Sequence, residues 1–226
     1  MTSSQEPTGS SRSADVYARL RAAILHGDFA PEDPLKPQHL ATSFGVSLAV
    51  VRESLLRLVG EGLATRLQNK GFAVPAVSAD RWQQIAEARA AIESSTLALA
   101  LARGDLAWEA RVRSSHHVLA GTPMYDDGHH ASDAWSDAHR VFHRSLLEGC
   151  GNPVLLESFD RLWTASELAR RWSVAATPRR DVAGEHAALE AAALARDADA
   201  AVDILRAHLG LTVEVLQAER AGKEAG

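Results

Sequence analysis

The sequence contains one cysteine, Cys150, among its 226 residues. A chain with a single cysteine cannot form an internal disulfide, and this suits the reducing cytosol. Cys150 is expected to be a small buried apolar residue rather than a reactive thiol. No apolar run approaches the roughly 18 to 20 residues of a membrane-spanning helix, and residues 1–13 lack the apolar segment of a secretory signal. We therefore expect a cytoplasmic protein without a membrane segment.

The sequence also lacks an overall basic charge, because its formal net charge is −5. The charge is unevenly spread: residues 1–79 carry a net charge of +1 and the remainder −6. Within residues 36–70, five lysines and arginines are set against two glutamates. A local basic surface matters more for contact with phosphates than the total charge does. Such an excess is also typical of an ordinary solvated face.

Residues 14–79 have the pattern of three helices followed by a β-hairpin. The predicted segments are helices over 14–27, 38–44 and 48–60 and strands over 63–67 and 72–77. Gly45 ends the second helix, Ser47 is placed to cap the third, and Gly71 supplies the positive φ of a hairpin turn. This order describes a winged helix-turn-helix. From the pattern alone, an arbitrary small α+β domain is an equal alternative.

Strand signals are absent from the rest of the chain, where alanine-rich helical stretches alternate with short links. About six such helices predict an all-α bundle. The fold is therefore expected to be mainly α, with a winged helix-turn-helix followed by this bundle. The expected organisation is a disordered leader over 1–13, the winged domain over 14–79, the helical domain over 80–220 and a tail over 221–226.

Several short segments have the order and spacing of a known family of regulators. In the first domain they are LRAAILHG (20–27), LA (40–41), GVS (45–47), VRESLLRL (51–58), EGL (61–63) and KGFAV (70–74). In the second domain they are RAAIE (89–93), FH (142–143), GNP (151–153), EH (185–186) and RAHL (206–209). The chain resembles GntR-type bacterial regulators of the FadR-like branch, with a helical effector-binding (FCD) domain. This resemblance implies a homodimeric, ligand-responsive transcription regulator that binds a pseudo-palindromic operator in double-stranded DNA.

The candidate DNA-binding residues are Ser47, Arg52, Arg57, Lys70 and Gly71. A recognition helix reads base edges with its N-terminal turns, and Arg52 lies one turn inside the third helix. Its guanidinium can donate two hydrogen bonds to guanine or bind a phosphate, and Ser47 can donate to a phosphate. Lys70 and Gly71 form the predicted wing tip, which could reach the backbone or a minor groove. Arg57 lies further along the helix, as a surface or phosphate-binding residue.

Two positions depart from the family's pattern in this region. Leu48 and Gln38 stand where family members usually carry arginine, and Val50 stands where a proline is common. Two familiar guanine or phosphate contacts are therefore missing. We expect the fold to be unchanged and the operator sequence to differ from the family's usual one.

Four of the ten histidines have a spacing that suits a metal site. His139 and His143 lie four residues apart on one face of a predicted helix, and His186 and His208 lie on later helices that could converge in a bundle. From the residues alone, surface or singly bonded histidines are the more common outcome. The resemblance implies a divalent metal held by one aspartate and three histidines. His143, His186 and His208 match the histidines.

His139 occupies the position of the family's aspartate, and Asp137 lies two residues earlier, where it faces elsewhere on the helix. A site made of imidazoles suits zinc, with nickel as an alternative. Without a carboxylate ligand, the metal would keep a fuller positive charge for an anionic effector. We therefore expect a small organic acid as the effector.

Arg89 is the candidate effector-binding residue, because an inward guanidinium could pair with a carboxylate. A salt bridge with Glu93, four residues later, is an equal alternative. The sequence offers no catalytic motif such as GxSxG, HExxH or a phosphate-binding loop, so we do not expect an enzyme. One alternative is a metal-dependent helical enzyme in which Glu185 acts as base. Another is a ligand-binding module that has lost DNA specificity, which Gln38 and Leu48 suggest.

Overall fold

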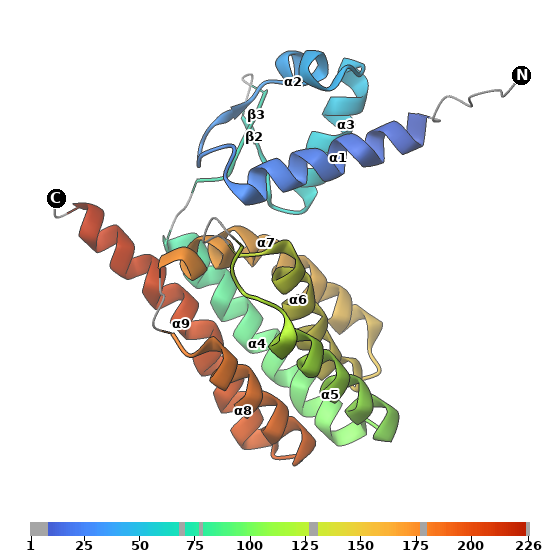
Figure 1. Cartoon of the computed structure of the whole chain (residues 1–226), viewed down its shortest axis with the longest axis vertical. Coiled ribbons are helices and arrows are strands. Elements are labelled where there is room, and N and C mark those ends of the chain that lie inside the picture. Colours follow the sequence, from blue (N-terminus) through green and yellow to red (C-terminus); the bar gives the residue numbers. More distant parts are fainter. Residues whose placement is uncertain (1–8, 68–70, 77–78, 127–130, 177–179, 225–226) are drawn as a thin grey trace, which may run out of the picture. The chain divides into compact units, whose positions relative to one another are not determined.

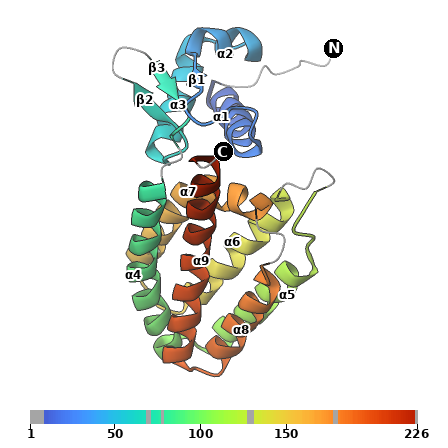
Figure 2. The same cartoon turned by 90° about the vertical axis from the view of Figure 1, so that its left-hand side faces the viewer.

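In the computed structural model the chain forms two compact units, Met1–Val77 and Ser78–Gly226. The structure describes residues 9–67, 71–76, 79–126, 131–176 and 180–224. Helices dominate both units (Figures 1 and 2), which confirms the prediction of a mainly α fold. Among the described residues, no helix has the length and apolar character that crossing a membrane requires.

The first unit contains three helices and a small antiparallel sheet. Its elements are α1 (Gly9–His26), β1 (Pro34–Leu35), α2 (Pro37–Phe44), α3 (Leu48–Gly60), β2 (Thr65–Leu67) and β3 (Gly71–Ala73). The strand order is β1-β3-β2, and Arg66 pairs with Phe72 across the hairpin. The winged helix-turn-helix is therefore confirmed, with β1 as a strand that the sequence pattern did not predict. Helix α1 begins at Gly9, within the segment expected to be a leader.

Local sequence accounts for the turn between α2 and α3. Gly45 ends α2 with a φ of 65°, in the left-handed region that glycine adopts without steric cost. Ser47 caps α3, and its side chain accepts a hydrogen bond from the Val50 amide. Apolar side chains at helical spacing on α1 and α3 then form the core of the unit. Its fully buried members include Leu20, Ile24, Val51, Leu55 and Leu58.

The second unit is a bundle of the six helices α4 to α9 in the part of the chain that is described. They are α4 (Ala79–Arg103), α5 (Leu106–Gly121), α6 (Asp133–Glu148), α7 (Pro153–Ala176), α8 (Val182–Leu194) and α9 (Ala198–Glu224). Figures 1 and 2 show α4 beside α9, and these two helices are in extensive contact. Side chains of Asp105, Ser132 and Asp181 cap α5, α6 and α8, which fixes where each helix begins.

The ends of α4 and α6 approach closely at two glycines. A Cβ atom at Gly149 would lie 2.8 Å from the Ala100 carbonyl oxygen and 3.1 Å from the Gly104 Cα. Trp108, which is fully buried, fills the space beside them, and its Nε1 donates to the Ser145 carbonyl at 2.9 Å. Backbone packing at this point leaves no room for a side chain at position 149.

Gly149→Ala should therefore destabilise the chain by about 1–3 kcal/mol, the usual cost of an overpacked site. Gly121→Ala is the matched control, because a Cβ there meets nothing within 4 Å at the end of α5. We expect it to stay within about 0.5 kcal/mol of wild type or to stabilise. Urea unfolding followed by circular dichroism measures both variants, and equal effects would contradict the close packing.

Candidate metal centre and nucleic-acid interface

Four buried histidines meet inside the second unit. His139 and His143 come from α6, His186 from α8 and His208 from α9, and each offers a nitrogen within 4.8 Å of the others. Each of the four residues is no more than 7% exposed. The structure thus brings together all four predicted metal ligands, while Asp137 is an exposed residue of α6 outside the cluster.

The nitrogens of this cluster fit a metal better than a hydrogen-bonded core. Neither nitrogen of His139 nor Nδ1 of His143 has a hydrogen-bond partner among the described residues, although buried polar atoms are normally paired. Nε2 of His143 lies 3.3 Å from Nε2 of His186, close to the spacing of about 3.3 Å between ligands on a tetrahedral zinc with bonds of ~2.0 Å. The donor set is therefore suited to zinc or a similar divalent ion.

Burial also keeps these imidazoles neutral. Desolvation lowers the pKa of His139 and of His143 well below the ordinary 6.5, and the neighbouring imidazoles lower both further. Burial likewise lowers the pKa of His186 to about 2. A neutral imidazole has a free lone pair, which is the form that binds metal.

The rings are held in place by aromatic packing. Trp135 stacks on His139 with ring centroids 4.5 Å apart. Trp163 lies edge-on to His139 at 5.0 Å, and Phe142 lies 5.5 Å from His186. The cluster is thus enclosed by apolar surface that excludes water from most of its nitrogens.

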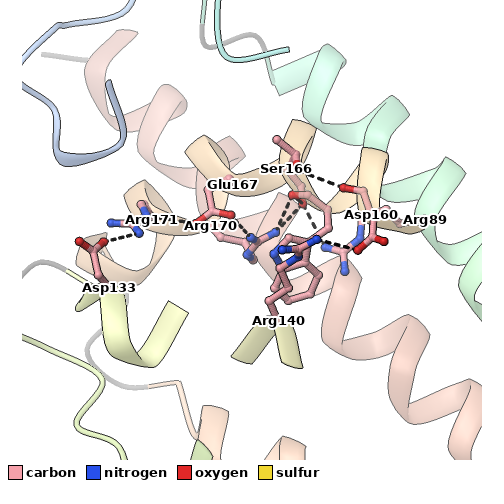
Figure 3. A network of polar contacts seen from close by, with 10 residues as sticks. Arg89, Asp133, Arg140, Asp160, Ser166, Glu167, Arg170 and Arg171 are labelled. Atoms are coloured by element: carbon pink, nitrogen blue, oxygen red, sulfur yellow. Dashed lines mark hydrogen bonds and ion pairs between the residues drawn. The ribbon is translucent and has the colours of Figure 1, made fainter. Parts of the chain in front are cut away.

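Side chains of α4 and α7 form a charged network (Figure 3), and its arginines lie close enough to the cluster to lower the pKa of His143. Arg89 forms an ion pair with Glu93 at 2.5 Å and donates to Ser166 at 3.3 Å. Arg170 donates to Ser166 at 2.6 Å and to Glu167 at 2.9 Å. Arg89 thus makes the salt bridge with Glu93 that the sequence offered as an alternative to effector binding.

This network places positive charge next to the imidazoles. Arg89 lowers the pKa of His143, and Arg170 lowers the pKa of both His139 and His143. Burial lowers the pKa of Arg170 itself to about 9, so its guanidinium is still protonated at neutral pH. Sequence reasoning missed Arg170, because its proximity to α6 comes only from helix packing.

Glu185 is a second residue whose place the sequence did not reveal. It precedes His186 on α8, but its Oε2 lies 2.7 Å from Nδ1 of His208. Arg180 donates to both of its carboxylate oxygens, at 2.8 and 2.6 Å. Burial raises the pKa of Glu185, but the hydrogen bonds from Arg180 and His208 outweigh it and bring the pKa to about 2.

A cavity of about 260 Å³ adjoins the cluster at His186. Trp135, Met124 and Tyr125 supply aromatic and apolar parts of its lining, and Arg180 supplies a cation. A molecule in this cavity would contact His186 itself and Trp135, which stacks on His139.

The first unit has a separate basic cavity between α2, α3 and the wing, of about 540 Å³. Arg52 lines it together with Lys36, Gln38, Arg66 and Gly71. Lys36, Arg52 and Arg66 have exposed side chains, as contact with phosphates or bases requires. Arg66 was not predicted as a site residue; its alternating position on β2 carries it to this side of the hairpin.

The other predicted DNA-binding residues are placed as follows. Ser47 is the exposed N-cap of α3, and Gly71 opens β3 with a φ of 94°. Arg57 pairs with Glu61 at 3.3 Å and lies 3.7 Å above the Tyr17 ring, so part of its bonding capacity is used within the unit. Lys70 lies outside the described residues.

Comparison with known proteins assigns the two units to known families. Residues 12–74 match the family described as bacterial regulatory proteins, gntR family, and residues 84–211 match the FCD domain. The HTH-type transcriptional repressor GlaR of Escherichia coli (strain K12) is 32% identical over 215 residues, covering 93% of this chain and 98% of GlaR. The uncharacterized HTH-type transcriptional regulator BphR of Paraburkholderia xenovorans (strain LB400) is 34% identical, covering 89% of this chain and 84% of BphR.

The fold also recurs in solved structures. E. coli McbR/YncC superposes with a TM-score of 0.72 at 22% identity, covering 93% of this chain and 99% of that one. A putative GntR regulator from Rhodococcus sp. RHA1 gives a TM-score of 0.73 at 22% identity, covering 92% and 99%. Together these findings define a DNA-binding transcription regulator with a winged helix-turn-helix and a helical second domain. The chain belongs to the GntR family and carries an FCD domain.

The neutral histidines lead to a prediction for the metal-free protein. Their folded pKa values lie below the 6.5 of the unfolded chain, so the unfolded state binds more protons as the pH falls. Stability is therefore complete above pH 6.5 and is lost below it, by about 1.4 kcal/mol per histidine at pH 5.5.

Urea unfolding of chelator-treated protein at pH 7.5 and pH 5.5 measures this loss. His139→Gln should show a smaller loss than wild type, because one proton fewer is taken up on unfolding. His117→Gln, at an exposed position of α5, is the control and should retain the full loss. An undiminished loss in His139→Gln would contradict the assignment of a neutral buried imidazole.

Proposed function

We propose that this chain is a cytoplasmic, metal-dependent transcription regulator that binds a pseudo-palindromic operator as a homodimer and responds to a small carboxylate. The observation that carries the proposal is the cluster of four buried, neutral histidines beside positively charged side chains, in a chain that also has a DNA-binding domain.

His139, His143, His186 and His208 would hold the metal, with zinc as the first candidate and nickel as the alternative. Bound there, the ion would supply a Lewis-acidic centre for a carboxylate oxygen. Neutral imidazoles leave the charge of a divalent ion uncompensated, so an anionic ligand gains more here than at a site with carboxylate ligands. This electrostatic argument favours a small organic acid.

The side chains around the cluster support the same class of effector. Arg89 and Arg170 bring positive charge close enough to depress the pKa of the imidazoles. We infer that Arg89 contributes to effector binding while it remains paired with Glu93. The cavity beside His186 offers Trp135 and Met124 for the organic part of the acid.

DNA recognition is assigned to the basic cavity and the start of α3. Arg52 is the candidate for base contact, Ser47 and Arg57 for phosphate contact, and Lys70 with Gly71 for the wing. Leu48 is 38% exposed at the first position of α3. An apolar side chain at this end of a recognition helix suits the methyl group of thymine. We infer that Leu48 reads thymine where an arginine would read guanine.

Two subunits would place their recognition helices about one turn of DNA apart. A carboxylate that binds one arrangement of the dimer better by ~1–3 kcal/mol is sufficient to change DNA affinity 5- to 150-fold. The alternative of a metal-dependent enzyme has less support, because Glu185 is bound to Arg180 and His208. The alternative of a module without DNA specificity is an outcome of the test below.

Selection from a random duplex library, at near-physiological salt and with zinc present, tests the function. We expect enrichment of a two-fold symmetric motif, with thymine at one position of each half-site that Leu48→Arg changes to guanine. Arg52→Ala should cost about 1–3 kcal/mol on the selected duplex and relax one position. Arg66→Ala, in the same cavity, should weaken all duplexes alike and reduce the salt dependence.

Repeating the selection with added carboxylic acids and with chelator tests the sensory part. Absence of any enriched motif under all conditions would rule out sequence-specific regulation and leave the module without DNA specificity. An affinity of Arg52→Ala within twofold of wild type would remove Arg52 from the interface.

A further inference from the structure

The hydrogen bond between Glu185 and His208 determines which nitrogen of His208 is available to a ligand. Glu185 is paired with the Arg180 guanidinium at 2.6 Å, and an ionised carboxylate only accepts hydrogen bonds. The 2.7 Å contact between Oε2 and Nδ1 of His208 therefore places a proton on that nitrogen. Nη2 of Arg180 lies 3.3 Å from the same Nδ1, but its two hydrogens are directed to the nearer Glu185 Oε2 and His208 carbonyl oxygen. Nε2 of the neutral ring is then left with its lone pair, on a ring whose centroid lies 5.0 Å from that of His143.

Arg180 forms hydrogen bonds with both Glu185 and His208. It donates through Nε and Nη2 to the two oxygens of Glu185, and Nη2 also donates to the His208 carbonyl oxygen at 2.8 Å. Arg180, Glu185 and His208 thus form a closed triangle of contacts between the start of α8 and α9. A planar guanidinium that binds both oxygens fixes the carboxylate plane as well as its position.

The two neighbouring residues of α8 face the cluster in different roles. His186 brings a nitrogen into the cluster, whereas Glu185 contacts the histidine contributed by α9. Histidines that bind metal usually donate their other N–H to a carboxylate or carbonyl, which fixes the tautomer and raises the basicity of the ligand. His208 is the member of the four for which a carboxylate occupies this position among the described residues.

We propose that Glu185 is the residue that positions His208 for metal binding and that Arg180 holds Glu185 in that role. The inference rests on the proposed metal site and adds two residues that do not touch the metal. Arg180 also lines the cavity beside His186. The same side chain therefore connects the cavity wall to a member of the metal cluster.

A purely electrostatic role and a positioning role of Arg180 predict opposite effects of Arg180→Gln on metal affinity. If Arg180 acted only through its charge, Arg180→Gln would strengthen the binding of a cation. If Arg180 holds Glu185 in place, the same change weakens metal binding. Glu185→Gln removes a negative charge and the strong acceptor together, so Arg180→Gln is the variant that separates the two explanations.

Helix α8 provides a matched control for the carboxylate. Glu190 accepts from Nδ1 of His116 at 2.7 Å, in the same kind of pair as Glu185 with His208. His116 is not a member of the metal cluster. Glu190→Gln therefore removes a carboxylate–imidazole pair and one negative charge from the same helix, without touching a metal ligand.

The test measures zinc affinity of the full-length chain by competition with a chromophoric chelator, with circular dichroism to verify folding of each variant. We expect Glu185→Gln to weaken zinc binding about 10- to 100-fold, Arg180→Gln to weaken it, and Glu190→Gln to stay within threefold of wild type. Affinities of Glu185→Gln and Arg180→Gln within threefold of wild type, or tighter zinc binding by Arg180→Gln, would overturn the proposal.

Nitrogen NMR of histidine-labelled, metal-free protein gives a second readout that does not need zinc. The expected result is His208 protonated at Nδ1 in wild type and a shifted tautomer mixture in Glu185→Gln. An Nε2-protonated His208 in wild type would overturn the inference even if zinc binds. Failure of wild type to bind zinc would instead contradict the proposed metal-dependent function, and the NMR result would still decide the role of Glu185.

Discussion

Four imidazoles buried side by side without enough hydrogen-bond partners are the constraint around which the second domain is organised. Buried nitrogens without partners cost free energy, and His139 with His143 accounts for three such atoms. The rings are nevertheless fixed by Trp135, Phe142 and Trp163. Departures from full polar satisfaction in a well-packed core are typical of functional sites. A divalent cation would bind one nitrogen of each ring, so it would give His139 a partner and join the facing Nε2 atoms of His143 and His186.

The side chains around the cluster are consistent with the binding of a divalent cation together with an anion. Burial removes the proton from each imidazole, and Arg89 and Arg170 on the α4 and α7 side, each paired with a glutamate, lie close enough to lower the pKa of His143 further. Positive charge next to a cation site opposes metal binding but favours an anion that binds together with the metal. The domain therefore combines a donor set suited to a divalent metal with arginines that would favour an anion bound beside it. Under the proposed function, this combination would link metal content to a carboxylate signal.

Much of this architecture follows from local sequence. The spacing of Leu20, Ile24, Val51 and Leu55 predicts the helices of the first domain, and Gly45 with Ser47 predicts the turn between α2 and α3. The four histidines were identified by the i, i+4 spacing of two of them and by resemblance for the others. Strand β1 was missed, because a pair of residues gives no periodicity from which a strand could be recognised.

The residues that sequence could not supply depend on packing between distant helices. Arg170 and Glu185 carry no motif of their own, and both acquire their roles from neighbours on other elements. Arg66 was visible only as part of a basic excess. For Arg89 the local alternative, a salt bridge to Glu93, is formed, because an i, i+4 pair on a helix requires no tertiary information. Short-range geometry was therefore predictable from the residues alone, whereas contacts between helices were predictable only where the family resemblance supplied them, as for the four histidines.

We infer that the four histidines bind a metal through nitrogen alone. X-ray absorption at the zinc edge of the reconstituted full-length chain measures the ligand shell, and elemental analysis gives the metal content per chain. We expect about one zinc per chain and a first shell of light atoms at about 2.0–2.1 Å, with the outer-shell scattering of several imidazoles that His143→Ala diminishes. Less than about 0.2 zinc per chain after reconstitution, or a shell without imidazole scattering, would contradict it.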